Sequence, residues 1–196
     1  MYKRQHITYD GFKFFTIAQI PEIKNKVVTM NGVSKSYAMT GWRIGYAAGP
    51  KEIIKAIAKI QSQSTTNPSS ISQAAAVEAL NGVQDFISIR SKAFEERRDF
   101  VVNSLNSIDG INCLKPDGAF YVFPSCKDLI GKKDKNGKKI ENDTDFVQSL
   151  LENNGIAVVQ GSAFGLDGFF RISYATSMDN LEKAMKRIKD FCEGLS

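Results

Sequence analysis

A long amphipathic stretch, from Gln84 to Leu105, constrains the fold of this chain more than any other feature. Its apolar residues recur at the spacing of a helix face, which predicts one continuous helix. The residues expected on its inward face are Phe86, Ile89, Ala93, Phe100 and Leu105. The charged centre, Glu95 to Asp99, is interpreted as a solvated surface. Because the pattern of apolar residues changes after this helix, we expect a domain hinge along it.

The segment before the long helix alternates short strands with helices. Runs from Val27 to Met30 and from Arg43 to Ala48 are typical of strands. Pro50 suits the first turn of a helix, and the polar loop Gln61–Ser70 separates that helix from a second one at Ile71–Leu80. The apolar stripe of the first helix consists of Ile53, Ile54, Ile57 and Ile60.

Beyond the long helix, the pattern becomes that of an α+β domain. Strands are predicted at Ala119–Phe123, Ile156–Val159 and Phe169–Tyr174. Helices are predicted at Thr144–Asn153 and Met178–Phe191, because their apolar residues recur at helical spacing.

The composition is that of a globular chain with a modest positive charge. It has 196 residues, 42% of them hydrophobic and 24% charged, and a formal net charge of +5. The densest basic run, Lys132–Lys139, contains the pair Asn136-Gly137, which predicts a hairpin with a type I′ turn. Acidic residues interrupt and follow this run, and no RNA- or DNA-binding signature accompanies it. We therefore expect a solvated hairpin and no nucleic-acid partner.

The few histidines and cysteines exclude several kinds of chemistry. The chain has one histidine, His6, and three cysteines that lie far apart in the sequence. A zinc site usually needs several such ligands at close spacing, so we expect no His/Cys metal cluster. Cys113, Cys126 and Cys192 are expected to be free, buried thiols in a reducing cytoplasm. No apolar run approaches the roughly 18 residues of a membrane span, and the start of the chain lacks the apolar region of a signal peptide.

The segment from Asn31 to Gly45 carries the residues with the most chemistry. Lys35 is expected in a turn between the two predicted strands, and Arg43 at the start of the second strand. An amine can bond covalently to an aldehyde, and a guanidinium can hold a phosphate through a bidentate contact. Gly41 is expected to give the backbone freedom to turn, and Gly45 to allow a close approach. Taken alone, such a lysine is more often solvated, and such an arginine more often packs on a neighbour.

The segment SKSYAMTGWRIGY, from Ser34 to Tyr46, resembles the cofactor-lysine motif of class I pyridoxal-phosphate aminotransferases. Its form is typical of the bacterial-type aspartate aminotransferase subgroup. Four further segments are similar to the same family: Gln63–Pro68, Pro116–Tyr121, Ala157–Gly161 and Phe170–Ala175. The resemblance therefore extends over essentially the whole chain.

This resemblance implies an α/β architecture, the type I pyridoxal-phosphate-dependent transferase fold. Residues 1–95 would form the C-terminal part of the large cofactor-binding domain, and residues 96–196 the small α+β C-terminal domain. The aspartate that precedes Tyr2 in the family, and everything before it, is absent. We therefore expect this chain to correspond to the C-terminal half of an aminotransferase, to be inactive alone, and to expose apolar surface and strand edges.

The resemblance also assigns roles to five residues. Lys35 matches the lysine that forms a Schiff base with pyridoxal 5′-phosphate, and Arg43 the arginine that binds the cofactor phosphate. Tyr2 matches the tyrosine that contacts the ring oxygen of the cofactor. Arg171 matches the arginine that binds the substrate α-carboxylate, and Asn67 lies in a substrate-binding loop near the neighbouring subunit's active site.

The implied activity is transfer of the amino group of L-aspartate to 2-oxoglutarate. A different donor or acceptor, such as prephenate or an aromatic amino acid, stays open, because the side-chain pocket lies mostly outside this chain. A non-catalytic fragment that associates with a full-length protomer is a further alternative. The full-length protein is expected to be a cytoplasmic homodimer that acts on amino acids and 2-oxo acids, without a nucleic-acid or membrane partner.

Overall fold

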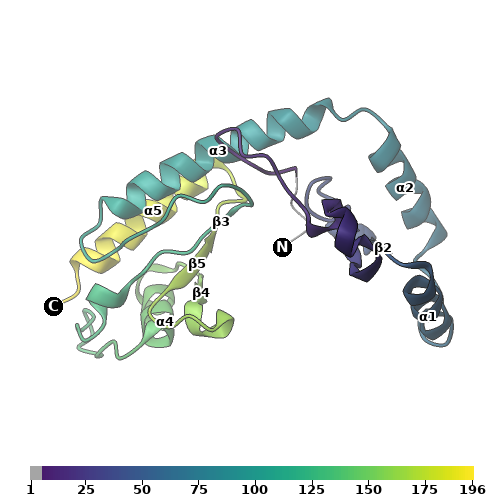
Figure 1. The fold of residues 1–196 in the computed structure, drawn as a ribbon. Coiled ribbons are helices and arrows are strands. Elements are labelled where there is room, and N and C mark those ends of the chain that lie inside the picture. Colours follow the sequence, from purple (N-terminus) through teal and green to yellow (C-terminus); the bar gives the residue numbers. More distant parts are fainter. Residues whose placement is uncertain (1–5) are drawn as a thin grey trace. The chain divides into compact units, whose positions relative to one another are not determined.

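The computed structural model describes residues 6–196, which divide into two compact units with the boundary between Ser91 and Lys92. Figure 1 shows helices and short strands in both parts of the chain. Among the described residues, no helix combines the length and the apolar character that crossing a membrane requires.

The first unit combines two short strands with helices of very different lengths (Figure 1). Its elements, in chain order, are η2 (Ile17–Gln19), η3 (Pro21–Lys26), β1 (Thr29–Gly32), η4 (Thr40–Trp42), β2 (Gly45–Ala48), α1 (Lys51–Ser62), α2 (Ser70–Asn81) and the beginning of α3 (Asp85–Asn106). The helices confirm the predicted sequence of two helices before a long third one. Both strands begin two residues later than predicted, because their ends are set by how they pair.

Strands β1 and β2 form an antiparallel pair in which Gly32 lies opposite Gly45. A Cβ atom on Gly45 would lie 3.1 Å from the carbonyl oxygen of Asn31, and one on Gly32 would lie 3.1 Å from that of Ile44. Such distances are tighter than ordinary van der Waals contact, so a side chain here would push the strands apart. The close approach expected at Gly45 is therefore confirmed.

Helix α1 leaves its apolar stripe uncovered. None of its residues is buried, and Ile60 is 72% exposed. The pattern continues in α2, where Ile71 is 71% exposed and Val77 is 59% exposed. The helical spacing of these residues predicted a helix correctly, and the expected exposed apolar surface is confirmed in this unit.

Helix α3 begins in the first unit and continues into the second. Its predicted extent is confirmed to within one residue at each end. Two expectations about its faces are wrong. Ile89 is 69% exposed rather than inward, and Arg98, which was assigned to a solvated surface, is fully buried.

The second unit is an α+β arrangement around a three-stranded antiparallel sheet. Its elements after α3 are β3 (Tyr121–Val122), η5 (Lys127–Leu129), α4 (Asp143–Asn154), β4 (Val159–Gln160), η6 (Gly161–Phe164), β5 (Phe170–Ser173) and α5 (Met178–Glu193). The strand order is β3-β5-β4, so β5 is central. Both predicted helices and the strand at β5 are confirmed. The strand predicted at Ile156–Val159 forms later, because only Val159 and Gln160 pair with β5.

The core of the second unit is continuous and aromatic. Helix α5 buries Leu181, Met185 and Ile188, while Phe146 of α4 contacts the rings of Phe170 and Phe191 at centroid distances of 5.0 and 5.4 Å. Cys113, Cys126 and Cys192 are buried and free, as predicted. Burial raises the pKa of the Cys113 thiol to about 11, and of Cys126 and Cys192 to about 12.

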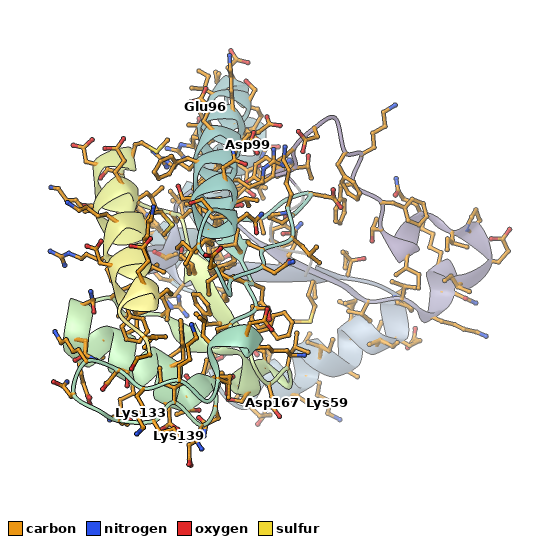
Figure 2. All side chains as sticks on the ribbon, turned by 90° about the vertical axis from the view of Figure 1, so that its left-hand side faces the viewer. Lys59, Glu96, Asp99, Lys133, Lys139 and Asp167 are labelled. Atoms are coloured by element: carbon orange, nitrogen blue, oxygen red, sulfur yellow. The ribbon has the colours of Figure 1, made fainter. Side chains whose placement is uncertain are left out.

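The charged hairpin forms, but its turn differs from the prediction. The amide of Gly137 donates to the carbonyl of Asp134 at 2.8 Å, and only Gly137 of the Asn136-Gly137 pair has a positive φ, 81°. A type I′ turn would need a positive φ at both residues. Lys133 and Lys139 lie at the edge of the molecule in Figure 2, which agrees with their exposure. Asp134 is the exception, because it is buried.

Candidate functional site

Lys35 lies in the turn between β1 and β2, as predicted. The amide of Ala38 donates to the carbonyl of Lys35 at 3.1 Å, which closes the turn. Ala38 has a φ of 55°, in the left-handed region that residues other than glycine rarely adopt. Lys35 itself is half-buried. The backbone that carries the Lys35 side chain is therefore a tight turn.

The residues that follow Lys35 attach this turn to the rest of the first unit. Ser36 is buried, and the hydroxyl of Tyr37 donates to Oε1 of Gln84 at 3.0 Å. The side-chain Nε2 of Gln84 in turn donates to the carbonyls of Ala79 and Gly82 at 2.9 and 2.8 Å. Burial, together with nearby Tyr46, raises the pKa of the Tyr37 phenol. Gln84 thus links the Lys35 turn to the connection between α2 and α3.

Sequence reasoning missed both Tyr37 and Gln84. The two residues are 47 positions apart, and no local pattern predicts a hydrogen bond over that distance. The available signal was a single aromatic residue two positions after Lys35, which was not treated as a positioning group.

Arg43 does not begin the second strand, which corrects the prediction. It ends η4 in a left-handed conformation, with φ 52° and ψ 44°, and β2 starts only at Gly45. Gly41, which was expected to provide the turn, has no positive φ. A left-handed non-glycine residue costs on the order of 1 kcal/mol, and such conformations cluster at functional sites.

The guanidinium of Arg43 is exposed and keeps most of its donors for a ligand. Its Nη1 donates to the carbonyl of Thr40 at 3.0 Å. Within residues 6–196, no carboxylate forms an ion pair with it. An arginine with five N–H donors and a single main-chain partner can receive a phosphate.

Asn67 lies in the exposed connection between α1 and α2. Its amide donates to the carbonyl of Thr65 at 2.8 Å, and the intervening Thr66 has a φ of 64°. This tight turn keeps Asn67 at the surface of the first unit.

Arg171 belongs to the second unit and lies on the central strand β5. Its neighbours in sequence, Phe170 and Ile172, are buried. Because side chains alternate between the two faces of a strand, Arg171 lies on the opposite face of the sheet from this core. Its Cζ atom lies 4.6 Å from the ring centroid of Tyr121 and 4.5 Å from that of Phe164.

A buried arginine supports the loop that precedes β3. Arg98 donates to the carboxylate of Asp99 at 2.9 Å and to the carbonyl of Pro116 at 3.1 Å. Two residues after the Pro116-Asp117 pair, Ala119 has a φ of 69°. The carbonyl of Ala119 accepts a 3.1 Å hydrogen bond from the hydroxyl of Tyr174. The network fixes the segment that leads into Tyr121.

The predicted site residues are divided between the two units. Lys35 and Arg43 share the connection between β1 and β2, and Asn67 is in the same unit. Arg171 is in the second unit, and Tyr2 lies outside the residues that the structure describes. Across positions 6–196, no three His, Cys, Asp or Glu residues are grouped so that they could hold a metal ion.

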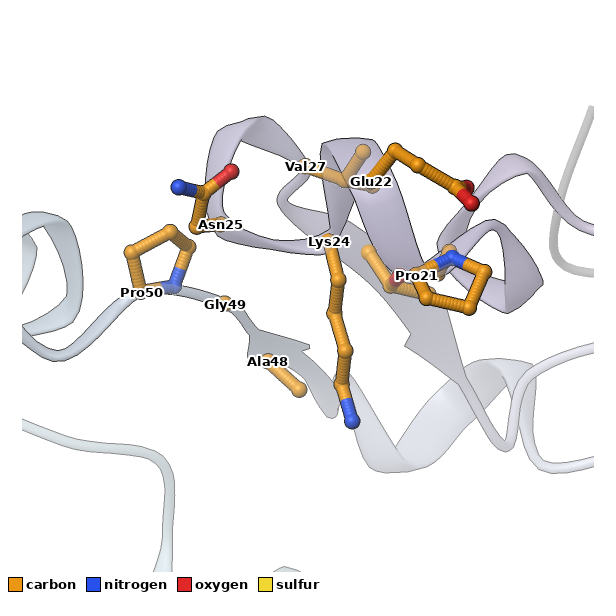
Figure 3. Close-up of a pocket in the computed structure, with 10 residues that line it drawn as sticks. Pro21, Glu22, Lys24, Asn25, Val27, Ala48, Gly49 and Pro50 are labelled. Atoms are coloured by element: carbon orange, nitrogen blue, oxygen red, sulfur yellow. The ribbon is translucent and has the colours of Figure 1, made fainter.

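A cavity in the first unit lies away from these residues. It measures about 700 Å³, and η3 and the end of β2 line it through Pro21, Lys24, Ala48 and Pro50. Figure 3 shows Lys24 and Pro50 among the residues that line this cavity. Lys35 and Arg43 do not line it. This cavity therefore does not coincide with the predicted site residues.

A family model described as aminotransferase class I and II matches residues 5–188. The aspartate aminotransferase of Rhizobium meliloti (strain 1021) is 60% identical over 193 residues, 98% of this chain and 47% of that protein. The probable aspartate/prephenate aminotransferase of Rhizobium leguminosarum bv. phaseoli is 60% identical over 189 residues, 96% of this chain and 47% of that protein. The chain thus spans about half the length of the curated relatives it matches.

Solved structures are similar to the chain over the same extent. The crystal structure of the aspartate aminotransferase from Rhizobium meliloti matches with a TM-score of 0.96 at 59% identity, over 99% of this chain and 49% of that one. Aspartate aminotransferase from Thermus thermophilus with maleate matches with a TM-score of 0.85 at 38% identity, over 95% of this chain and 46% of that one.

Proposed function

The chain belongs to the aminotransferase class I and II family, and we propose that it forms part of an enzyme that transfers the amino group of L-aspartate to 2-oxoglutarate. The observation that carries this proposal is the 60% identity to an aspartate aminotransferase over 98% of the chain. The cofactor is pyridoxal 5′-phosphate. Residues 1–95 are proposed to be the C-terminal part of the large domain, and residues 96–196 the small domain.

The donor set of the first unit fits this cofactor. The Lys35 turn offers a half-buried amine for an aldehyde, and Arg43 offers a guanidinium whose described contacts include no competing carboxylate. When bound, pyridoxal phosphate supplies an electron sink that makes the α-proton of an amino acid acidic. Tyr2 is proposed to contact the ring oxygen.

Each residue then has a distinct task. Arg43 binds the phosphate and keeps the cofactor in register with Lys35. The Nζ atom of Lys35 would hold the cofactor through its aldehyde group. As a neutral amine, the same Nζ would accept the proton from the substrate Cα as a general base and deliver it to the cofactor as a general acid. Arg171 orients the α-carboxylate, and Asn67 is proposed to contact substrate from its loop.

The names of the relatives favour a second candidate substrate. One relative is called a probable aspartate/prephenate aminotransferase at 60% identity. Prephenate, like aspartate, carries an anionic carboxylate that an arginine can bind. We expect an assay of the complete protein with 2-oxoglutarate and with prephenate as amino acceptors to show whether it uses one of them or both.

The complete protein is proposed to be a homodimer that works in the cytoplasm on amino acids and 2-oxo acids. Because the chain spans about half the length of its relatives, we expect the 196-residue chain alone to show no transaminase turnover. Measurable turnover by the purified chain would overturn that expectation.

Peptide mass spectrometry tests the cofactor site directly. The chain is mixed with pyridoxal phosphate, reduced with borohydride and digested. We expect a stoichiometric adduct on Lys35, which Arg43→Ala reduces about tenfold because the phosphate contact is lost. Lys26→Ala, which removes a positive charge from exposed η3, is the matched control and should leave the adduct unchanged. Adducts spread evenly over surface lysines would contradict the proposal.

A further inference from the structure

We propose that Tyr121 and Phe164 are positioning residues for Arg171, and that their rings set the orientation in which its guanidinium receives the substrate carboxylate. The inference rests on the proposed function, because it assumes that Arg171 binds that carboxylate. It adds to the site two residues for which the sequence predicted no role.

The geometry comes from two different elements that converge on one side chain. Tyr121 lies on β3, which pairs with β5 so that Tyr121 is opposite Ser173. Since side chains two positions apart on a strand share a face, Tyr121 and Arg171 are diagonal neighbours on that face. Phe164 comes from the end of η6. Both ring centroids lie within 4.6 Å of the Cζ atom of Arg171.

Aromatic rings can hold a guanidinium without occupying its hydrogen-bond donors. A ring attracts the cation through its quadrupole, whereas a carboxylate partner would use the same N–H groups that a substrate needs. Within the described part of the chain, Arg171 has no ion pair with a carboxylate. The side chain is thus oriented while its planar donors stay available for a bidentate contact.

The placement of Phe164 leaves its ring accessible beside Arg171. The residue is 49% exposed. Its edge contacts Phe123 at a centroid distance of 5.9 Å. The turn that carries it is firmly held, because the buried carboxylate of Asp143 accepts a 2.6 Å hydrogen bond from the amide of Ser162.

Nuclear magnetic resonance of the 196-residue chain tests the inference through the Nε–Hε signal of Arg171, assigned by its loss in Arg171→Lys. Protons above aromatic rings move upfield, so we expect an upfield Hε signal that Phe164→Leu and Tyr121→Leu return toward the free value.

The second measurement is a titration of each variant with maleate as the probe ligand. We expect Phe164→Leu to weaken maleate binding about three- to tenfold, and Phe164→Tyr to restore it.

Two controls separate this inference from the proposed function. Phe169→Leu removes a comparable contact, the ring 5.0 Å from Nζ of Lys127, and should leave maleate affinity unchanged. Equal losses in Phe169→Leu and Phe164→Leu would overturn the inference, because the effect would be general. If Arg171→Ala leaves maleate affinity unchanged, the proposed role of Arg171 fails. If Arg171→Ala abolishes binding while Phe164→Leu changes neither signal nor affinity, only the positioning role fails.

Discussion

The two units of this chain use similar amounts of apolar sequence in opposite ways. The second unit closes a core around Phe146, Phe170 and Ile188, all fully buried. The first unit has few buried apolar side chains and leaves whole helix faces exposed, including Ile60 at 72%. Amphipathic spacing is present in both, so the difference is in what covers the apolar face. A helix gains most of its stability from such cover, and the units should therefore differ in stability.

The sharpest test of this comparison is amide hydrogen exchange. Helix α5 buries five residues, whereas α1 buries none. We expect amides in the centre of α5 to exchange at least about a hundredfold more slowly than those of α1, because opening α5 exposes the core. Equal protection in the two helices would contradict the expected difference in stability between the two units.

Matched truncations of one apolar residue in each unit come next. Phe146→Ala should lower the free energy of unfolding by about 3–5 kcal/mol, because the ring is fully buried. Ile60→Ala should lower it by less than about 0.5 kcal/mol, because the side chain is mostly in solvent. Urea denaturation followed by fluorescence and circular dichroism measures both. A large loss in Ile60→Ala would mean that the first unit does cover its helices.

The buried cation of the second unit gives an intermediate effect. Arg98→Met should destabilise the unit by about 2–3 kcal/mol, because it removes the hydrogen bond to Pro116 and leaves Asp99 with one cation fewer. Arg97→Met, on the same helix and only half-buried, is the control and should cost less than about 1 kcal/mol. Thermal denaturation distinguishes them, and similar losses would contradict the role of Arg98.

The smallest expected effect is a pH dependence from the hairpin. Burial acts to raise the pKa of Asp134, but hydrogen bonds from Asn153 and from the amides of Lys138 and Asn136 outweigh it and lower that pKa. The carboxylate therefore stabilises the fold above the unfolded pKa of about 3.9, and this contribution is lost as the pH falls through the lower folded value.

Asp134→Asn should flatten the stability profile below about pH 4, whereas Asp128→Asn, at an exposed position, should not. Denaturation midpoints across this range provide the measurement. An unchanged profile in Asp134→Asn would show that another carboxylate governs acid unfolding.

Sequence patterns predicted the helices and the Lys35 turn because both depend on local spacing. They did not predict that Arg98 is buried, because its partner Pro116 lies 18 positions away. The left-handed Arg43 was missed for a related reason, since a single backbone angle depends on how η4 ends and β2 pairs. The isoleucines of α1 define an apolar face, but the sequence of the helix does not predict whether another element covers that face. Arg171 was found through a motif, whereas the rings beside it come from β3 and η6.

The three buried cysteines allow the opening of the second unit to be followed by thiol labelling. All of them lie after residue 91, and burial raises each pKa, to about 11 for Cys113 and about 12 for the other two. At neutral pH these thiols stay protonated and react slowly with an alkylating reagent. Each modification event must therefore await an opening of this unit alone. The rate of thiol labelling therefore measures how often the second unit opens. The first unit does not contribute to it, because residues 1–91 contain no cysteine.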